Sequence, residues 1–75
     1  MDTFHFGIFQ TLYAHFVDEL DPPLASNQEF DEFEDNLKQL VLNSNLSQED
    51  DGDTIWQKLA LNKHKYPYFT YISFN

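Results

Sequence analysis

Residues 26–41 read SNQEFDEFEDNLKQLV, and this stretch decides the fold. At roughly 100° per residue its large apolar side chains fall within a stripe about 100° wide, which is typical of a helix that packs one face against a core. The stripe consists of Phe30, Phe33, Leu37, Leu40 and Val41. Ser26, with Glu29 three residues later, has the spacing of a capping box. We therefore expect an amphipathic helix that starts at Ser26 and fades in residues 43–45, where Asn, Ser and Asn prefer turns.

A second helical pattern precedes this stretch. Between Ile8 and Leu20 the apolar residues come mainly as adjacent pairs that recur every four residues, so they cover one side of a helix. The helix should end before residues 21–23, Asp-Pro-Pro, because the residue before a proline avoids the helical region and proline has no backbone donor. Its start is open, since Thr3–Ile8 alternates with period two and is rich in aromatic residues, as a short strand would be.

A third helix is predicted from a later apolar group with helical spacing, which consists of Ile55, Trp56, Leu59 and Ala60. Either Ser47 or Asp53 could cap it, and we favour Asp53 because Gly52 would interrupt a helix that began earlier. The uncharged residues 66–74 are mostly strand-favouring, so we expect an extended segment that begins beside Pro67.

Together these patterns predict a single small acidic domain, residues 1–75, that is mainly α. Three short helices would pack together with the aromatic C-terminal segment laid across them. The expected core consists of Phe9, Leu12, Phe16, Phe30, Phe33, Leu37, Leu40, Trp56 and Leu59. The main alternative is an α+β fold in which Thr3–Ile8 pairs with Tyr68–Phe74 as antiparallel strands.

The composition excludes several kinds of partner. Thirteen carboxylates stand against four lysines and no arginine, which leaves a formal charge of -9. Such a chain is repelled by phosphates, so we expect neither direct nucleic-acid binding nor attachment to an anionic membrane. The chain has no cysteine and no apolar stretch of the roughly 20 residues that span a bilayer. The expected location is the cytoplasm.

We find no constellation of residues that predicts an enzyme, a metal site or a cofactor. If Gly52 took the sixth place of a calcium loop, the twelfth place would hold Lys58 where a bidentate carboxylate is needed. The histidines show no zinc-ligand spacing; they are His5, His15 and His64. No nucleophile motif or glycine-rich phosphate loop is present, and carboxylates on an exposed helix face lack the dry cleft that acid-base catalysis requires.

The excess charge lies entirely in the first half of the chain. Residues 1–37 hold nine acids and no lysine, whereas residues 38–75 hold four acids and four lysines. Eight of the nine fall at the junction of the first two helices; they are Asp18, Glu19, Asp21, Glu29, Asp31, Glu32, Glu34 and Asp35. Five carboxylates between Glu29 and Asp35 occupy about 9 Å of helix, and duplex DNA presents about five phosphates in that length.

This density has two interpretations. An acidic helix face is often only a solvated surface. However, like charges three and four residues apart destabilise a helix, and solubility alone is served equally well by mixed signs. We therefore hypothesise an acidic inhibitor that presents carboxylates where phosphates would bind, with a basic, nucleic-acid-handling protein as its partner. In composition and size only, the chain resembles the DNA-mimic proteins that phages and mobile elements use against restriction, CRISPR or repair enzymes.

Tyr66, Tyr68 and Tyr71 would supply anchoring contacts to such a partner, although their rings could instead complete the core. One alternative function is an immunity-type or regulatory module that grips a cognate protein through helix faces and the tyrosine-rich segment. Another is donation of residues 66–74 as a strand to a partner or to a second copy, which would form a homodimer.

Overall fold

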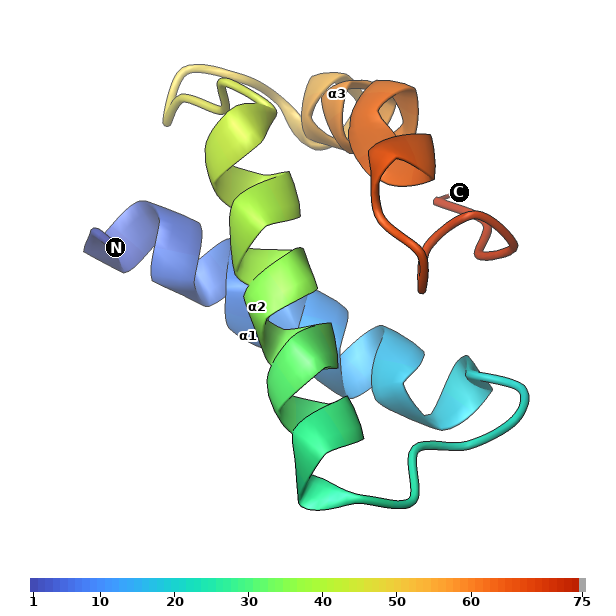
Figure 1. Cartoon of the computed structure of the whole chain (residues 1–75). Helices are drawn as coiled ribbons and strands as arrows, with labels where there is room; N and C mark the ends of the chain where they lie inside the picture. The colour runs from blue at the N-terminus through green and yellow to red at the C-terminus, as the bar shows by residue number, and fades with distance from the viewer. Residues whose placement is uncertain (75) are drawn as a thin grey trace.

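Three α-helices make up most of the chain, of which the computed structural model describes residues 1–74 (Figure 1). They are α1 (Thr3–Phe16), α2 (Asn27–Asn43) and α3 (Gly52–Asn62), and short 3-10 turns follow α1 at Val17–Glu19 and α3 at Lys63–Lys65. No strand forms within the described residues. The mainly α prediction is confirmed, and the α+β alternative, in which Thr3–Ile8 pairs with Tyr68–Phe74, is wrong.

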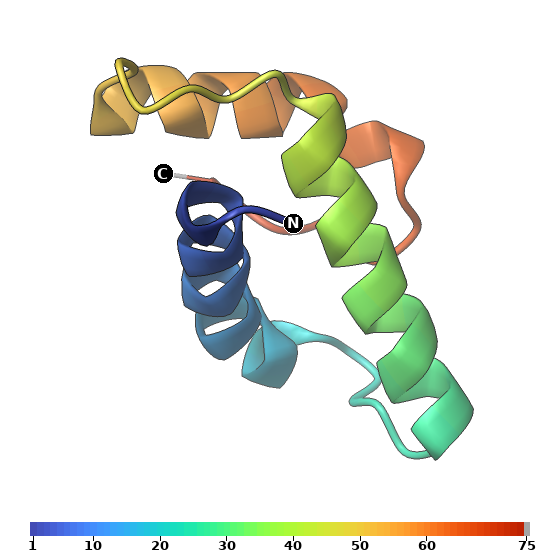
Figure 2. The ribbon, with the colours of Figure 1, turned by 90° about the vertical axis from the view of Figure 1, so that its left-hand side faces the viewer.

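The three helices are not parallel. α1 and α2 cross each other and are in contact, and α3 lies across one end of this pair (Figure 1, Figure 2). The C-terminal segment then turns back and ends between α1 and α3, where Phe74 contacts Phe16 and Trp56 (Figure 1, Figure 2). None of the helices within residues 1–74 has the length and apolar character needed to cross a membrane.

α1 begins at Thr3, so it includes Thr3–Ile8, for which the sequence left helix and strand open. The reason for this start is Asp2, whose side chain caps the helix by accepting a 2.8 Å hydrogen bond from the backbone N–H of His5. Because residues four apart lie on the same side of a helix, Phe4 and Ile8 both pack against the edge of the core. The aromatic alternation in Thr3–Ile8 was therefore compatible with a helix as well as with a strand.

α2 starts as predicted. Ser26 accepts a 3.1 Å hydrogen bond from the backbone N–H of Glu29, and its hydroxyl lies 3.2 Å from the Glu29 carboxylate. At the other end, Ser44 donates to the carbonyl of Leu40 at 2.6 Å and Asn45 takes a φ of 54°, in the left-handed region that asparagine tolerates. The predicted end of the helix in residues 43–45 is confirmed.

α3 is capped by Asp51, so the preference for Asp53 is wrong. Asp51 Oδ1 accepts a 2.7 Å hydrogen bond from the backbone N–H of Thr54. Gly52 is the first residue of the helix and does not interrupt it. A glycine is unfavourable chiefly in a helix interior, because it loses more backbone conformational freedom on folding than other residues do.

The C-terminal segment crosses the helices as predicted, but it is coiled rather than straight. Two successive turns form, in which Phe69 donates to the Tyr66 carbonyl at 3.3 Å and Ile72 to the Phe69 carbonyl at 3.4 Å. These turns direct Phe69, Ile72 and Phe74 into the core. A strand would have placed side chains on alternate sides, and this segment has no sheet to join.

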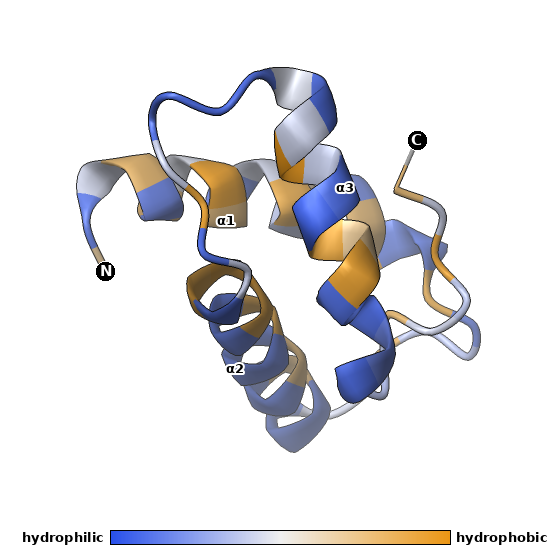
Figure 3. Cartoon of the chain, turned by 90° about the horizontal axis from the view of Figure 1, so that it is seen from above, coloured by the Kyte–Doolittle hydropathy of each residue, from blue (hydrophilic) through white to orange (hydrophobic). Residues whose placement is uncertain are grey.

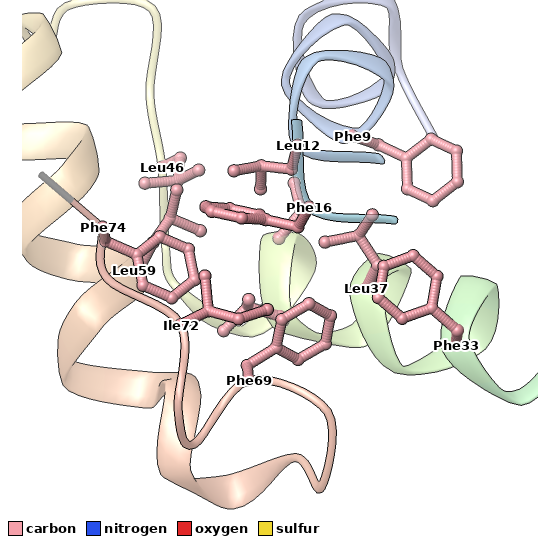
Figure 4. Close-up of a cluster of buried hydrophobic side chains, with 12 residues drawn as sticks. Phe9, Leu12, Phe16, Phe33, Leu37, Leu46, Leu59, Phe69, Ile72 and Phe74 are labelled. Atoms are coloured by element: carbon pink, nitrogen blue, oxygen red, sulfur yellow. The ribbon is translucent and has the colours of Figure 1, made fainter. Parts of the chain in front are cut away.

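Side chains from all three helices and the C-terminal segment form one core (Figure 4). The buried residues that were predicted are Phe9, Leu12, Phe16, Phe33, Leu37, Leu40 and Leu59. Trp56 is half-buried at the edge, where its ring lies 5.8 Å from that of Phe74. The prediction for Phe30 is wrong, because its side chain is exposed. Phe30 belongs to the first turn of α2, and this end of the helix lies beyond the crossing with α1 (Figure 1).

Candidate functional site

The carboxylates of α2 surround the helix on the sides that the core does not cover. Helical spacing places Asp31 and Asp35 opposite the buried Phe33, and both are exposed. Glu32 lies on one flank, beside the C-terminal segment, and Glu34 lies on the other flank, beside α1. Figure 3 shows hydrophilic residues over the outer surface of α2. The acidic residues of α2 therefore form a ridge rather than a flat face. Asp31 and Asp35 lie on its crest, and Glu32 and Glu34 lie on its two flanks.

Most of this charge is not compensated within the molecule. Of the eight clustered acids, Glu34 alone forms an ion pair among the residues that the structure describes, at 3.2 Å from Lys38 Nζ. Lys38 also lies over the ring of Phe9, 5.7 Å from its centroid. Glu32 accepts a 3.1 Å hydrogen bond from Gln28, which leaves its charge in place. The first lysine of the chain thus contacts Glu34 and the Phe9 ring of α1, and within the described residues it forms no ion pair with Asp31 or Asp35.

A groove of about 600 Å³ lies beside the start of α2. One wall is the link between α1 and α2, and the opposite wall is formed by the C-terminal turns. Both segments lie on the same side of α2 (Figure 1). The predicted site residues that line it are Glu19, Asp21, Glu29, Tyr68 and Tyr71. Residues from three separate parts of the sequence are brought together here.

Tyr68 connects the groove to the ridge of α2. Its hydroxyl donates a 3.3 Å hydrogen bond to Glu32 Oε2, and its ring packs edge-on against Phe33. Burial raises the pKa of Tyr68 above the ordinary tyrosine value, and the nearby negative charge of Glu32 raises it further. Tyr68 is therefore both part of the packing and part of the groove wall.

The other two predicted tyrosines differ from Tyr68 and from each other. Tyr71 is 93% exposed and lies at the edge of the groove. Tyr66 is partly buried at the opposite end of α2, where its hydroxyl accepts a 2.7 Å hydrogen bond from Asn43. Asn43 is about 21 Å along the helix from Glu29, at 1.5 Å per residue. The structure thus separates Tyr66 from the groove, and Asp18 is exposed without lining it.

Three of the acids outside this region have structural roles. Asp50 accepts a 2.8 Å hydrogen bond from Lys58, which lowers the pKa of that carboxyl, and Asp51 has its pKa lowered by the backbone N–H of Thr54. Asp2 is held in the same way by His5. Within residues 1–74, no three His, Asp or Glu side chains are grouped closely enough to hold a metal ion.

Sequence reasoning missed the apolar part of the groove. Leu20, Leu24 and Ile72 line it together with Pro22 and Pro67. Lys63 helps to form it by donating a 2.9 Å hydrogen bond to the Ile72 carbonyl, which fixes the C-terminal turns. Pro22 and Pro67 indicated that the link between α1 and α2 and the C-terminal segment would be irregular. Nothing in the sequence indicated that these two segments would meet.

No family model, curated protein or solved structure matches this chain.

Proposed function

We propose that this protein is a non-enzymatic inhibitor that binds the basic, nucleic-acid-binding surface of another protein, presenting carboxylates where phosphates would bind. The observation that carries the proposal is the ridge on α2. Asp31 and Asp35 are exposed on its crest, and neither is ion-paired within residues 1–74. Five carboxylates lie within about 9 Å of helix, close to the phosphate density of duplex DNA.

The distribution of charge supports attraction to a basic surface over long distances. The ridge belongs to a half of the chain with nine acids and no lysine, and Lys38, the first lysine, is paired to Glu34. Uncompensated charge of one sign accelerates association with an oppositely charged groove and makes binding sensitive to salt.

A ridge that serves only for solubility is the competing explanation. Asp31 and Asp35 are four residues apart and lie beyond the first turn of α2, where the helix dipole no longer favours carboxylates. Their repulsion destabilises the helix by a few tenths of a kcal/mol. A function in binding accounts for why this unfavourable pair is present, whereas solubility would be met by mixed charges.

The test is capture of the target from nuclease-treated cell lysate on the immobilised protein, followed by competition on the purified target. Duplex DNA or RNA should displace the protein, and binding should weaken steeply between low and physiological salt. The variant Asp31→Asn/Asp35→Asn should lose at least tenfold in affinity, since charged contacts at an interface are each worth about 1 kcal/mol or more.

A matched control removes the same two charges elsewhere. Glu49 and Asp53 are exposed on the link before α3 and at its start, so Glu49→Gln/Asp53→Asn changes the net charge equally. Circular dichroism should show both variants folded. If the two variants bind the target equally well, or if nucleic acid and protein bind it together, the mimicry proposal fails.

An immunity-type module is the second candidate, and the exposed ring of Tyr71 favours it. It predicts binding that persists in high salt and is lost in Tyr71→Ala. Strand donation is less favoured, because releasing residues 66–74 would expose Phe69, Ile72 and Phe74, which are buried in the core.

A further inference from the structure

The groove beside the start of α2 combines three features that are usually separate on a protein surface. Glu19, Asp21 and Glu29 supply carboxylates, Tyr68 and Tyr71 supply aromatic rings, and Ile72 belongs to its apolar lining. No lysine or histidine of the described chain lines it. Its volume, about 600 Å³, lies in the range of binding pockets for small groups, about 300–1,000 Å³.

We infer that this groove binds an arginine side chain of the basic partner. The inference rests on the proposed function and names the residue type that the partner inserts. A guanidinium is planar and always charged, it meets carboxylates through two parallel hydrogen bonds, and it stacks on aromatic faces. The groove offers both kinds of contact, whereas the crest of α2 offers carboxylates alone.

The carboxylates are free to make this contact. Glu19 and Asp21 form no ion pair within residues 1–74 and lie on the link after α1. Glu29 is shared with the cap of α2, since its carboxylate accepts a hydrogen bond from Ser26. Glu29 keeps its charge, but one of its oxygens is occupied by Ser26, so Glu19 and Asp21 have the carboxylates that are free for a partner.

The tyrosines distinguish arginine from lysine. The hydroxyl of Tyr68 is already bonded to Glu32, so its ring is held in place in the groove wall. Tyr71 is 93% exposed, and no residue of the described chain covers its ring. A guanidinium stacked on this ring would cover it, while the four-carbon stem of lysine ends in a compact, strongly hydrated ammonium that gains less from stacking.

The experiment compares octa-arginine and octa-lysine peptides, which carry equal charge, by calorimetry at physiological salt. The native protein should bind octa-arginine about tenfold more tightly, because the stacking and paired hydrogen bonds are available only to the guanidinium. The ring signals of Tyr71 in the NMR spectrum should shift with octa-arginine and much less with octa-lysine.

Three variants locate the effect. Tyr71→Ala keeps the net charge and should remove the preference for arginine. Glu19→Gln/Asp21→Asn should weaken octa-arginine binding at least fivefold more than the charge-matched Glu49→Gln/Asp53→Asn. Equal binding of the two peptides, a preference that survives Tyr71→Ala, or equal effects of the two charge-matched variants would overturn the inference.

The proposed function is tested separately by nucleic-acid competition on the captured target, so it can stand when this inference fails.

Discussion

The hydroxyl of Tyr68 donates a hydrogen bond to Glu32 Oε2, and this contact joins two residues 36 positions apart in the chain. It connects the turns of the C-terminal segment to the flank of α2. The same contact places a phenol hydroxyl, rather than a lysine, against one of the clustered carboxylates. The negative charge of Glu32 is therefore positioned without being neutralised.

The titration of Tyr68 reports this contact. Burial and then the charge of Glu32 hold the pKa of Tyr68 above the ordinary tyrosine value, so Glu32→Gln should lower the pKa but leave it raised, since burial is the larger cause. The folded state therefore holds the Tyr68 proton more tightly than the unfolded chain does. This contribution to folding stability is present below the unfolded tyrosine pKa of about 10, and it is lost as the pH rises through the pKa of Tyr68 in the folded protein. Ultraviolet absorbance titration of native protein and Tyr68→Phe isolates the group. A pKa that Glu32→Gln does not change would contradict the hydrogen bond.

Removing the buried ring of Phe69 should destabilise the protein strongly. Phe69 is fully buried and its ring centroid lies 5.4 Å from that of Phe33. Phe69→Ala should lower the free energy of unfolding by about 3–5 kcal/mol, while Tyr71→Ala, two residues away, should change it by less than about 0.5 kcal/mol. Urea denaturation measures both, and Phe69→Leu provides a milder variant if Phe69→Ala does not fold. Similar effects at the two positions would show that the C-terminal turns are not part of the core.

Replacing Gly7 by alanine should stabilise α1. Gly7 lies in the interior of the helix, and a Cβ built on it meets no atom of the described chain within 4 Å. Gly7→Ala should therefore raise the free energy of unfolding by about 0.5–1 kcal/mol, through the lower backbone entropy of alanine in the unfolded chain. The matched control is Ala14→Gly on the exposed side of the same helix, which should lower it by a similar amount. A loss of stability in Gly7→Ala, measured by thermal denaturation, would contradict the open space at this position.

The cap of α3 should depend on pH. The backbone N–H of Thr54 lowers the pKa of the Asp51 carboxyl, so the stabilisation is present above the ordinary aspartate pKa of about 3.9 and is lost as the pH falls through the lowered value. Asp51→Asn keeps a capping oxygen that does not titrate in this range. The stability of the native protein relative to this variant should therefore decrease between pH 6 and pH 2, roughly across that pKa. Parallel pH profiles in urea denaturation would show that Asp51 is not the cap.

Features that depend on a few neighbouring residues were predicted well. The capping box of Ser26 and Glu29 involves atoms three residues apart, and the buried stripe of α2 follows from helical spacing. Where a local rule has two solutions, the sequence left the choice open: the alternation in Thr3–Ile8 fits a strand or a helix, and the structure shows a helix capped by Asp2. Asp51 was missed because the cost of Gly52 depends on where the helix begins.

Burial was less predictable at the ends of elements. Phe30 and Phe33 share one apolar stripe, yet only Phe33 faces α1, because the crossing point covers part of α2 and not its first turn. The candidate site also combines a part that local sequence predicts with a part that only the tertiary structure shows. The acidic residues could be found by type and spacing, but the groove could not, since Asp21 and Tyr71 are brought together only when the C-terminal segment turns back over the helices.

By itself, the sequence determined that this chain forms three helices and carries its excess negative charge before Lys38. Both properties follow from local spacing and from simple counting, which do not require long-range contacts. The tertiary structure alone decided that Phe69, Ile72 and Phe74 complete the core and that Tyr68 and Tyr71 face acids of the first half. The physical reason is that three short helices leave their apolar faces incompletely covered, so the C-terminal segment packs wherever it buries most apolar surface.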